Sequence, residues 1–310
     1  MQKEIMIAVD DSRHSKNAVD YAVNLYQAVK EVKFTVMHVQ PTISQYLLDE
    51  AKSKPQAYAE LEKVNRKNAE VARDLLDKYK TQMVSAGVAE DLVQLKSQPR
   101  MLGIAKDVLQ ASTTGRFDAL ILGRRGLSGL QDMFIGSVSA NIVNNSVDTP
   151  VWLVDEKGPS HDIMVAVDGS ENSFKAVDHL AFIIEGSTDL KISFFHVAPR
   201  LQDFCPVEFE DVDSEALEQI ILQGDQHCVD QFYAHAQKKL HEAGVQESQI
   251  SFAAKEGVFR VGKAVLEEYR QGKFGTLVVG RRGVNKKFFT GSVSRYLINQ
   301  FSNGALWVVP

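Results

Sequence analysis

Hydrophobic and polar positions along the chain are arranged in blocks that predict parallel α/β structure. Short apolar, mostly β-branched runs predict five strands in the first half, at residues 5–9, 34–39, 92–95, 119–122 and 150–154. Between them, apolar side chains recur at helical spacing at residues 19–29, about 58–85, 104–109 and 138–143. Strands that alternate with helices in this way predict a parallel sheet covered by helices.

The second half of the chain repeats this plan. It has predicted strands at residues 163–167, 192–197, 250–253, 277–279 and 306–309, and predicted helices at 174–184, 216–241 and 261–269. Equivalent residues of the two halves are separated by nearly the same number of positions, as for Asp10 and Asp168 (168 − 10 = 158). We interpret the chain as a tandem duplication with domains at residues 1–155 and 163–310. The short linker predicts that the domains pack together.

Length and composition narrow the class of protein. A chain of 310 residues suits two domains of about 150 residues each. No run approaches the roughly 18 apolar residues of a membrane span, and a strand that begins by Ile5 leaves no room for a signal peptide. Two cysteines are not a disulfide framework, so we predict a cytoplasmic protein. A net charge of −5 argues against nucleic-acid binding.

A glycine-rich segment follows the fourth strand of each half. In the first half its fixed points are Gly123, Gly126, Gly136 and Ser137, and a helix start follows. In the second half they are Gly280, Gly283, Gly291 and Ser292. Glycine lets the backbone approach an anion, and the first N–H groups of a helix have no intrahelical partner, so this pattern predicts a phosphate-binding loop. An ordinary glycine-rich loop is the alternative, and the recurrence favours the phosphate site.

A second repeated pattern follows the first strand of each half. It reads Asp-x-Ser-x-x-Ser, at Asp10, Ser12 and Ser15 and again at Asp168, Ser170 and Ser173. Together with the G-x2-G-x9-G-[ST] spacing of the first glycine segment, it gives the chain a resemblance to tandem universal stress proteins of the ATP-binding type. This resemblance covers nearly all 310 residues. It implies two doubly wound, Rossmann-like parallel sheets of five strands in the order 3-2-1-4-5.

The resemblance also implies roles for individual residues. Asp10 is expected near the ribose of ATP and a bound Mg²⁺ or Mn²⁺, although it also suits a helix cap. The backbone of Val39 is expected to contact adenine. Backbone N–H groups of Gly126, Gly136 and Ser137, next to Val138, are expected to contact phosphate.

Two kinds of side chain near these residues have open interpretations. Arg124 and Arg125 either add positive charge beside the phosphates or form a solvated surface pair. His38 suits a packed structural role better than that of a catalytic base. No Walker sequence, nucleophile grouping or zinc spacing occurs in the chain.

The second half departs from the family pattern in its glycine segment. Seven residues separate Gly283 from Gly291, whereas nine separate Gly126 from Gly136. Lys286 and Lys287 can compensate by charge, while an acidic stretch at residues 208–218 would discourage a polyphosphate. We therefore expect a nucleotide site in the first domain. For the second domain we keep both a site at Asp168, Val197, Gly280, Gly283, Gly291 and Ser292 and a degenerate site.

Assembly and function complete the set of expectations. The apolar fifth strands are expected to pair within the chain as a pseudo-dimer, or between chains as a homodimer; Trp152 and Trp307 as plain core residues are the alternative. The resemblance implies an ATP-binding regulatory module of the stress response. The alternatives are an interaction protein without nucleotide and a slow ATP hydrolase, although we find no catalytic constellation.

Overall fold

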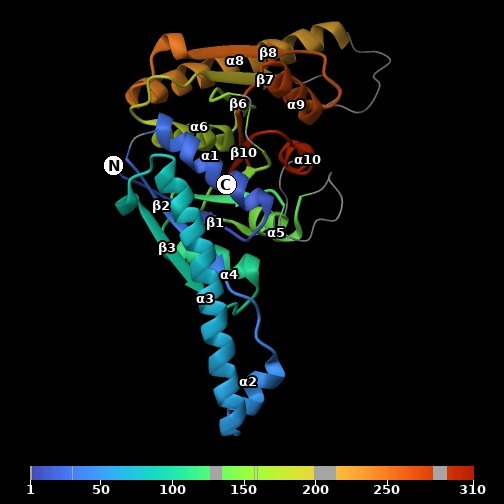
Figure 1. Ribbon diagram of the computed structural model, residues 1–310. Coiled ribbons are helices and arrows are strands. Elements are labelled where there is room, and N and C mark those ends of the chain that lie inside the picture. Colours follow the sequence, from blue (N-terminus) through green and yellow to red (C-terminus); the bar gives the residue numbers. More distant parts are fainter. Residues whose placement is uncertain are drawn as a thin grey trace. The chain divides into compact units, whose positions relative to one another are not determined.

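The chain forms two compact units in a computed structural model (Figure 1). Unit 1 comprises Met1–Tyr26 and Glu31–Asp155, and unit 2 comprises Gln27–Lys30 and Glu156–Pro310. The described residues are 2–29, 31–125, 135–156, 158, 160–198, 214–281 and 292–310, without the side chains of 214–218. Apart from residues 27–30, which cluster with unit 2, each unit contains one copy of the repeated sequence.

Unit 1 alternates strands and helices as the sequence pattern predicts. Its strands are β1 (Lys3–Ala8), β2 (Val32–Val39), β3 (Val93–Gln98), β4 (Ala119–Gly123) and β5 (Val151–Val154). Its helices are α1 (Arg13–Ala28), α2 (Gln45–Ala51), α3 (Pro55–Ser85), α4 (Ile104–Thr114) and α5 (Ser137–Asn145), with a 3-10 turn, η1, at Glu90–Leu92.

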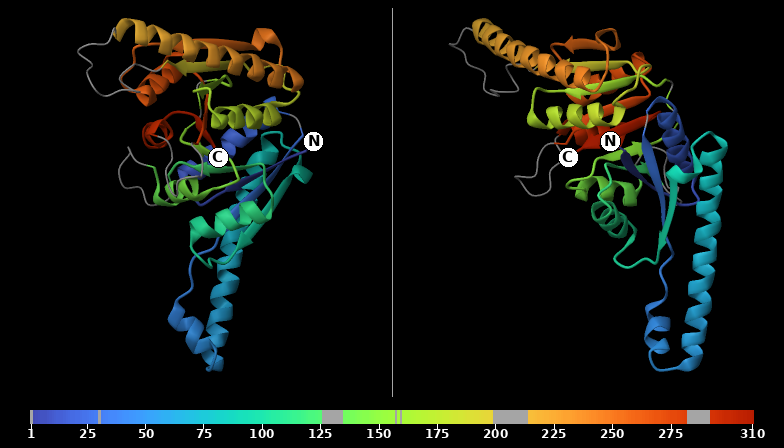
Figure 2. Two further views of the ribbon diagram at one scale, coloured as in Figure 1. Left: turned by 180° about the vertical axis from the view of Figure 1, so that it is seen from behind. Right: turned by 90° about the vertical axis from the view of Figure 1, so that its left-hand side faces the viewer.

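All strand pairs within unit 1 are parallel, in the order β3-β2-β1-β4-β5. The central strand β1 places Ile5 opposite Phe34 on β2 and Ala119 on β4, and all three are fully buried. The strands of a parallel sheet are buried on both faces because helices cover both sides. Helices α1 and α3 lie on one face and α4 and α5 on the other, which confirms the predicted doubly wound α/β fold (Figure 2).

Unit 2 repeats the same architecture. Its strands are β6 (Ile163–Val167), β7 (Ile192–Val197), β8 (Ile250–Lys255), β9 (Thr276–Gly280) and β10 (Ala305–Val309). Its helices are α6 (Glu171–Ile184), α8 (Ser214–Glu242), α9 (Val261–Gln271) and α10 (Ser292–Gln300), with a 3-10 turn, η2, at Glu247–Gln249. The strand order within the unit is β10-β9-β6-β7-β8, again parallel.

The sequence did not predict every element of unit 1. Helix α2 lies in a stretch that was expected to be a polar loop, and none of its residues is buried. It packs against the first part of α3, with which it projects from the sheet (Figure 1). Helix α4 continues to Thr114, beyond the expected end at residue 109. A seven-residue helix without a buried face carries no hydrophobic period, so the pattern could not reveal α2.

The tryptophans of the last strands pack as core residues in their own units. Trp152 on β5 is fully buried and meets the ring of Tyr21 edge-on, with centroids 6.5 Å apart. Trp307 on β10 is also fully buried and meets the ring of His179 at 5.7 Å in the same geometry. Tyr21 and His179 occupy equivalent positions of the repeat. The packing of these two strands against each other, within a chain or between chains, stays a prediction.

The ring of His179 predicts a pH-dependent stability of unit 2. Burial lowers the pKa of His179 from 6.5 to about 3. The pKa of His179 is lower in the folded than in the unfolded state, so between pH 3 and pH 6.5 the unfolded chain binds more protons. The contribution of His179 to the free energy of unfolding is therefore complete above pH 6.5 and declines as the pH falls toward 3. We expect a loss of about 1–2 kcal/mol at pH 5, measured as a lower thermal midpoint.

The repeat supplies a matched variant for this prediction. H179Y introduces the residue that faces tryptophan in unit 1 and removes the titrating group, so its thermal midpoint should change less between pH 7 and pH 5. An equally steep decline in H179Y and in the unsubstituted protein would show that other groups cause the pH dependence.

Candidate functional site

A pocket of about 430 Å³ opens at the carboxyl ends of the central strands of unit 1. The ends of β1, β2 and β4 and the starts of α4 and α5 bound it. In a doubly wound sheet, ligands bind at this crevice because the helices leave it in opposite directions. Six predicted site residues line the pocket: Asp10, Val39, Gly123, Gly136, Ser137 and Val138. The predicted contact at Gly126 lies outside the described residues.

Asp10 is held in place by a network of short hydrogen bonds. Its Oδ1 accepts from the hydroxyl of Ser15 at 2.7 Å and from the N–H of Ser12 at 3.1 Å. The hydroxyl of Tyr79, on α3, donates to the Asp10 carbonyl at 2.8 Å. Burial, assisted by the charge of Asp10, raises the pKa of Tyr79, which keeps this phenol a donor. Asp10 therefore both organises the start of α1 and lines the pocket.

The backbone of Val39 extends past the neighbouring strand. Strand β1 ends at Ala8, and the N–H of Val9 still donates to the carbonyl of Met37 at 2.9 Å. Alternate residues of a strand direct their backbone groups to the same side. Val39 therefore directs its N–H and carbonyl toward the same side as Met37, beyond the end of β1, where the pocket begins.

Helix α5 presents its first N–H groups at the pocket. Gly136 is the N-cap, and its carbonyl accepts the first intrahelical bond from Ala140 at 2.8 Å, so the N–H groups of Ser137 and Val138 have no intrahelical acceptor. The N–H of Gly136 donates to the Arg124 carbonyl at 2.9 Å. Contrary to the expectation, Gly136 does not offer its own N–H to a ligand, and the donors belong to the residues that follow it.

Gly123 has a packing role as well as its place in the pocket wall. A Cβ atom at this position would lie 2.7 Å from the carbonyl carbon and 2.8 Å from the carbonyl oxygen of His14, too close for any side chain. In unit 2, a Cβ at Gly280 would lie 2.4 Å from the carbonyl oxygen of Asn172. The first glycine of the motif thus allows the strand and the first helix to approach closely in both units.

The two arginines after β4 differ from each other. Arg124 is 2% exposed, is absent from the pocket lining and lies 4.0 Å from Asp155 Oδ1. Burial lowers the pKa of Arg124, and the charge of Asp155 opposes this shift. Arg125 pairs with the same oxygen at 2.9 Å and lines the pocket. Neither interpretation of Arg124, as a phosphate contact or as a solvated surface residue, agrees with this burial.

The histidines on the second strand of each unit are fixed by acceptors. His38 Nδ1 lies 2.8 Å from the Val9 carbonyl, which can only accept, so this nitrogen carries the proton. His196 Nδ1 lies 3.0 Å from the Val167 carbonyl, and its Nε2 lies 2.9 Å from a carboxylate oxygen of Asp225 on α8. These contacts agree with the structural role expected for His38.

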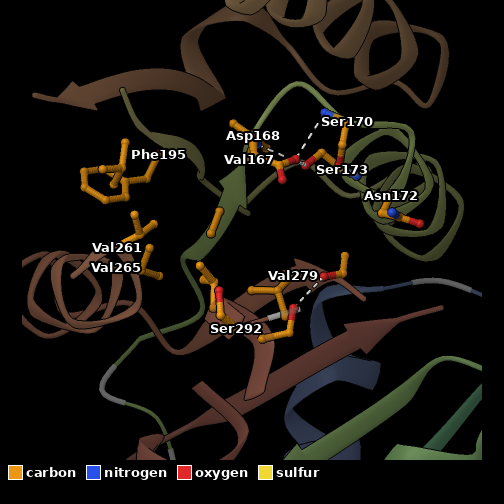
Figure 3. Close-up of a pocket in the computed structure, with 15 residues that line it drawn as sticks. Val167, Asp168, Ser170, Asn172, Ser173, Phe195, Val261, Val265, Val279 and Ser292 are labelled. Atoms are coloured by element: carbon orange, nitrogen blue, oxygen red, sulfur yellow. Dashed lines mark hydrogen bonds between the residues drawn. The ribbon is translucent and has the colours of Figure 1, made fainter. Parts of the chain in front are cut away.

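The corresponding pocket of unit 2 is smaller, at about 140 Å³ (Figure 3). Four predicted residues line it: Asp168, Val197, Gly280 and Ser292. The Asp-x-Ser-x-x-Ser network is preserved, with Asp168 Oδ1 accepting from Ser173 Oγ at 2.6 Å and from the Ser170 N–H at 3.1 Å. Predicted contacts at Gly283 and Gly291, and the charges at Lys286 and Lys287, lie outside the described residues.

Side chains account for part of this difference in volume. Phe195 stands in the pocket wall of unit 2 at the repeat position that Met37 has in unit 1 (Figure 3). The phenylalanine ring is larger than the flexible methionine side chain and cannot bend out of the way. Unit 2 therefore keeps the polar framework of the site but has less room for a ligand.

Sequence reasoning missed one wall of the unit 1 pocket. Arg100, between β3 and α4, lines it, as do Ile104 and Val108 on α4. The signal available was topological, because segments that follow neighbouring parallel strands meet at the same edge of the sheet. Residues directly after the third predicted strand therefore belong near the glycine-rich segment, although no motif marks them.

The described part of the chain lacks two further features. There, no three His, Cys, Asp or Glu residues are grouped so that they could hold a metal ion. No helix of the described ranges is long and apolar enough to cross a membrane.

Fold and pocket define a doubly wound α/β protein with a ligand-sized cleft at the carboxyl ends of its strands. A sequence model for the Universal stress protein family matches residues 1–155 and 159–310. The chain therefore belongs to the universal stress protein family, as a tandem two-domain member.

Two known proteins with similar sequences each match about half of this chain over nearly their whole length. Universal stress protein YxiE of Bacillus subtilis (strain 168) is 23% identical over 156 residues, which is 50% of this chain and 99% of the relative. The Universal stress protein in QAH/OAS sulfhydrylase 3'region of Thermus aquaticus is 30% identical over 159 residues, with the same coverage. A crystal structure of a universal stress protein from Archaeoglobus fulgidus DSM 4304 covers 99% of this chain and 97% of its own, with a TM-score of 0.65 and 17% identity. That structure shows the shared fold alone.

Proposed function

We propose that this universal stress protein binds ATP in the pocket of unit 1 and acts as a nucleotide-dependent regulatory module of a stress response. The observation that carries the proposal is the convergence of six residues predicted from the sequence and its family resemblance on one pocket. Its volume of about 430 Å³ lies within the range of about 300–1,000 Å³ found for small-molecule sites.

The polarity of the pocket gives the nucleotide a direction. The phosphates are placed at the start of α5, where unsatisfied N–H groups and the helix dipole favour negative charge. The nucleobase is placed at the opposite end, between the backbone of Val39 and the apolar side chains of Ile104 and Val108. The free N–H and carbonyl edge of Val39 complements the adjacent acceptor and donor of adenine.

A divalent cation fits this arrangement as part of the nucleotide complex. Mg²⁺ is usually held by one or two carboxylates together with phosphate oxygens and water, so a single carboxylate at Asp10 is sufficient. Mn²⁺ accepts the same oxygen ligands. When bound, the ion would neutralise phosphate charge, and Asp10 would contact it or the ribose hydroxyls.

Unit 2 is proposed to hold no ATP. Its pocket of about 140 Å³ is below the range for nucleotide-sized ligands, although Asp168, Val197, Gly280 and Ser292 line it. We therefore favour the degenerate second site over the intact one.

The number of nucleotides released per chain tests both parts of the proposal. Protein is purified, denatured and analysed by mass spectrometry, and the unsubstituted protein is then titrated with Mg-ATP by calorimetry. We expect one equivalent of adenine nucleotide per chain. No binding would favour the nucleotide-free interaction protein, and two equivalents would contradict the assignment to unit 1 alone. Release of ADP from ATP at about 1 per second would instead indicate an ATP hydrolase.

A further inference from the structure

The connection between β3 and α4 in unit 1 is held by a buried carboxylate. Asp107 is 1% exposed, and its two oxygens accept the N–H groups of Met101 and Leu102, each at 2.9 Å. The N–H of Asp107 donates back to the Gly103 carbonyl at 2.9 Å. Gly103 has a φ of +114°, a left-handed conformation that favours glycine. These bonds fix the backbone directly after Arg100.

Arg100 brings to the pocket a positive charge that no acidic side chain of the described residues pairs with. Its side chain lines the pocket, and among the described residues no carboxylate forms an ion pair with it. Arg125, the other arginine in the lining, is paired with Asp155. The guanidinium of Arg100 is therefore available to a ligand.

The strand order places Arg100 at the end of the pocket opposite to the phosphate end. Arg100 follows β3, and the glycine segment follows β4, with β2 and β1 between them. Three strand spacings of about 4.8 Å put these segments about 14 Å apart. Val39 pairs with Gln98, two residues before Arg100, and Ile104 begins α4 directly after this connection, so Arg100 lies at the proposed nucleobase end.

We propose that Arg100 is a specificity-determining residue that lies against the nucleobase of the bound nucleotide, and that Asp107 is the residue that positions it. This inference rests on the proposed function. A planar guanidinium stacks on aromatic rings. The part of the pocket next to Arg100 is lined by the apolar residues Ile104 and Val108. The ligand class that fits is an adenine nucleoside or nucleotide, read at its base rather than at its phosphates.

The repeat supports this assignment by contrast. In unit 2, the position of Arg100 is taken by Gly257 and that of Asp107 by Ala264. At these two positions, the unit with the small pocket therefore has neither the arginine nor the buried carboxylate. The two residues occur together in the unit proposed to bind nucleotide.

Calorimetric titration of R100A with adenosine, AMP and ATP tests the role of Arg100. We expect each dissociation constant to rise by a similar factor of about 10, because the lost contact is to the base shared by all three ligands. R100K should recover little affinity, since lysine has no planar face. R73A removes an exposed arginine of α3 outside the pocket lining and serves as the control for net charge.

The outcomes separate this inference from the proposed function. If the unsubstituted protein binds none of the ligands, the proposed function fails. If it binds them and R100A binds equally well, only the role of Arg100 is wrong. A loss confined to ATP would place Arg100 at the phosphates and overturn the nucleobase contact.

A double-mutant cycle tests the positioning role of Asp107. D107N loses one of the two acceptors, so the loop should loosen and adenosine affinity should fall. If Asp107 acts through Arg100, D107N should have little further effect in the R100A background. Fully additive losses would show that Asp107 affects binding independently of Arg100. Circular dichroism and thermal melting confirm that each variant is folded.

Discussion

Replacing Gly136 by valine is expected to weaken ATP binding by at least about 100-fold, because branched methyl groups would occupy the space proposed for phosphate oxygens. Gly136 lines the pocket directly before the two N–H groups of α5. Its φ of −61° and ψ of 146° are accessible to any residue, so the backbone itself tolerates the change. The dissociation constant of Mg-ATP, measured by calorimetry, tests this prediction.

The duplicated sequence provides the matched control. Gly291 is the equivalent glycine of the second motif, and G291V should leave ATP affinity unchanged if unit 1 alone holds the nucleotide. G136A shares the loss of the glycine cap but adds only one carbon, so it should have a smaller effect. Unchanged affinity in a folded G136V variant would contradict the phosphate assignment.

Replacing Asp155 by asparagine is expected to destabilise unit 1 by about 3 kcal/mol, since it removes the partner of a buried charge. The side chains of Arg124 and Asp155 are 2% and 4% exposed. The side chain of Arg125 is 20% exposed and can turn toward water, whereas the buried side chain of Arg124 cannot. For a unit of this size, the thermal midpoint should fall by roughly 10 °C, as measured by differential scanning calorimetry.

Two variants define what this destabilisation means. The double variant R124M/D155L replaces the charges by apolar side chains of similar volume, and it should recover most of the lost stability. E60Q removes an exposed ion pair with Lys63 and should change the midpoint little. If D155N has the same thermal midpoint as the unsubstituted protein, Arg124 has another partner that is sufficient to stabilise its charge.

Most of the fold could be predicted from the sequence because its signals are local. The strand through Ile5 is a short apolar run, and the glycine spacing after β4 marks one end of the pocket. Long-range relations carry no such signal. Arg124 is buried beside Asp155, which lies 31 positions later at the end of the neighbouring strand. The Gly136 N–H donates to the carbonyl of Arg124, 12 positions earlier in the chain.

Arg100 shows the same limit for the candidate site. No motif surrounds it, and only the sheet order brings the end of β3 to the same edge as Val39 and the start of α5. Asp107 carries no pattern beyond a place in the first turn of a helix. Its two bonds to the preceding loop become visible only when the backbone is known.

The close approach at Gly123 and Gly280 bears on how repeats of this kind diverge. Because a side chain at either position would collide with the first helix, selection for folding alone preserves both glycines. The serine networks around Asp10 and Asp168 also serve the fold, because they organise the start of the first helix of each unit. A copy that loses its ligand can thus keep half of its signature indefinitely. Under the proposed function, the pocket volume, the length of the glycine segment and Arg100 distinguish the binding copy from the other, whereas these motif residues do not.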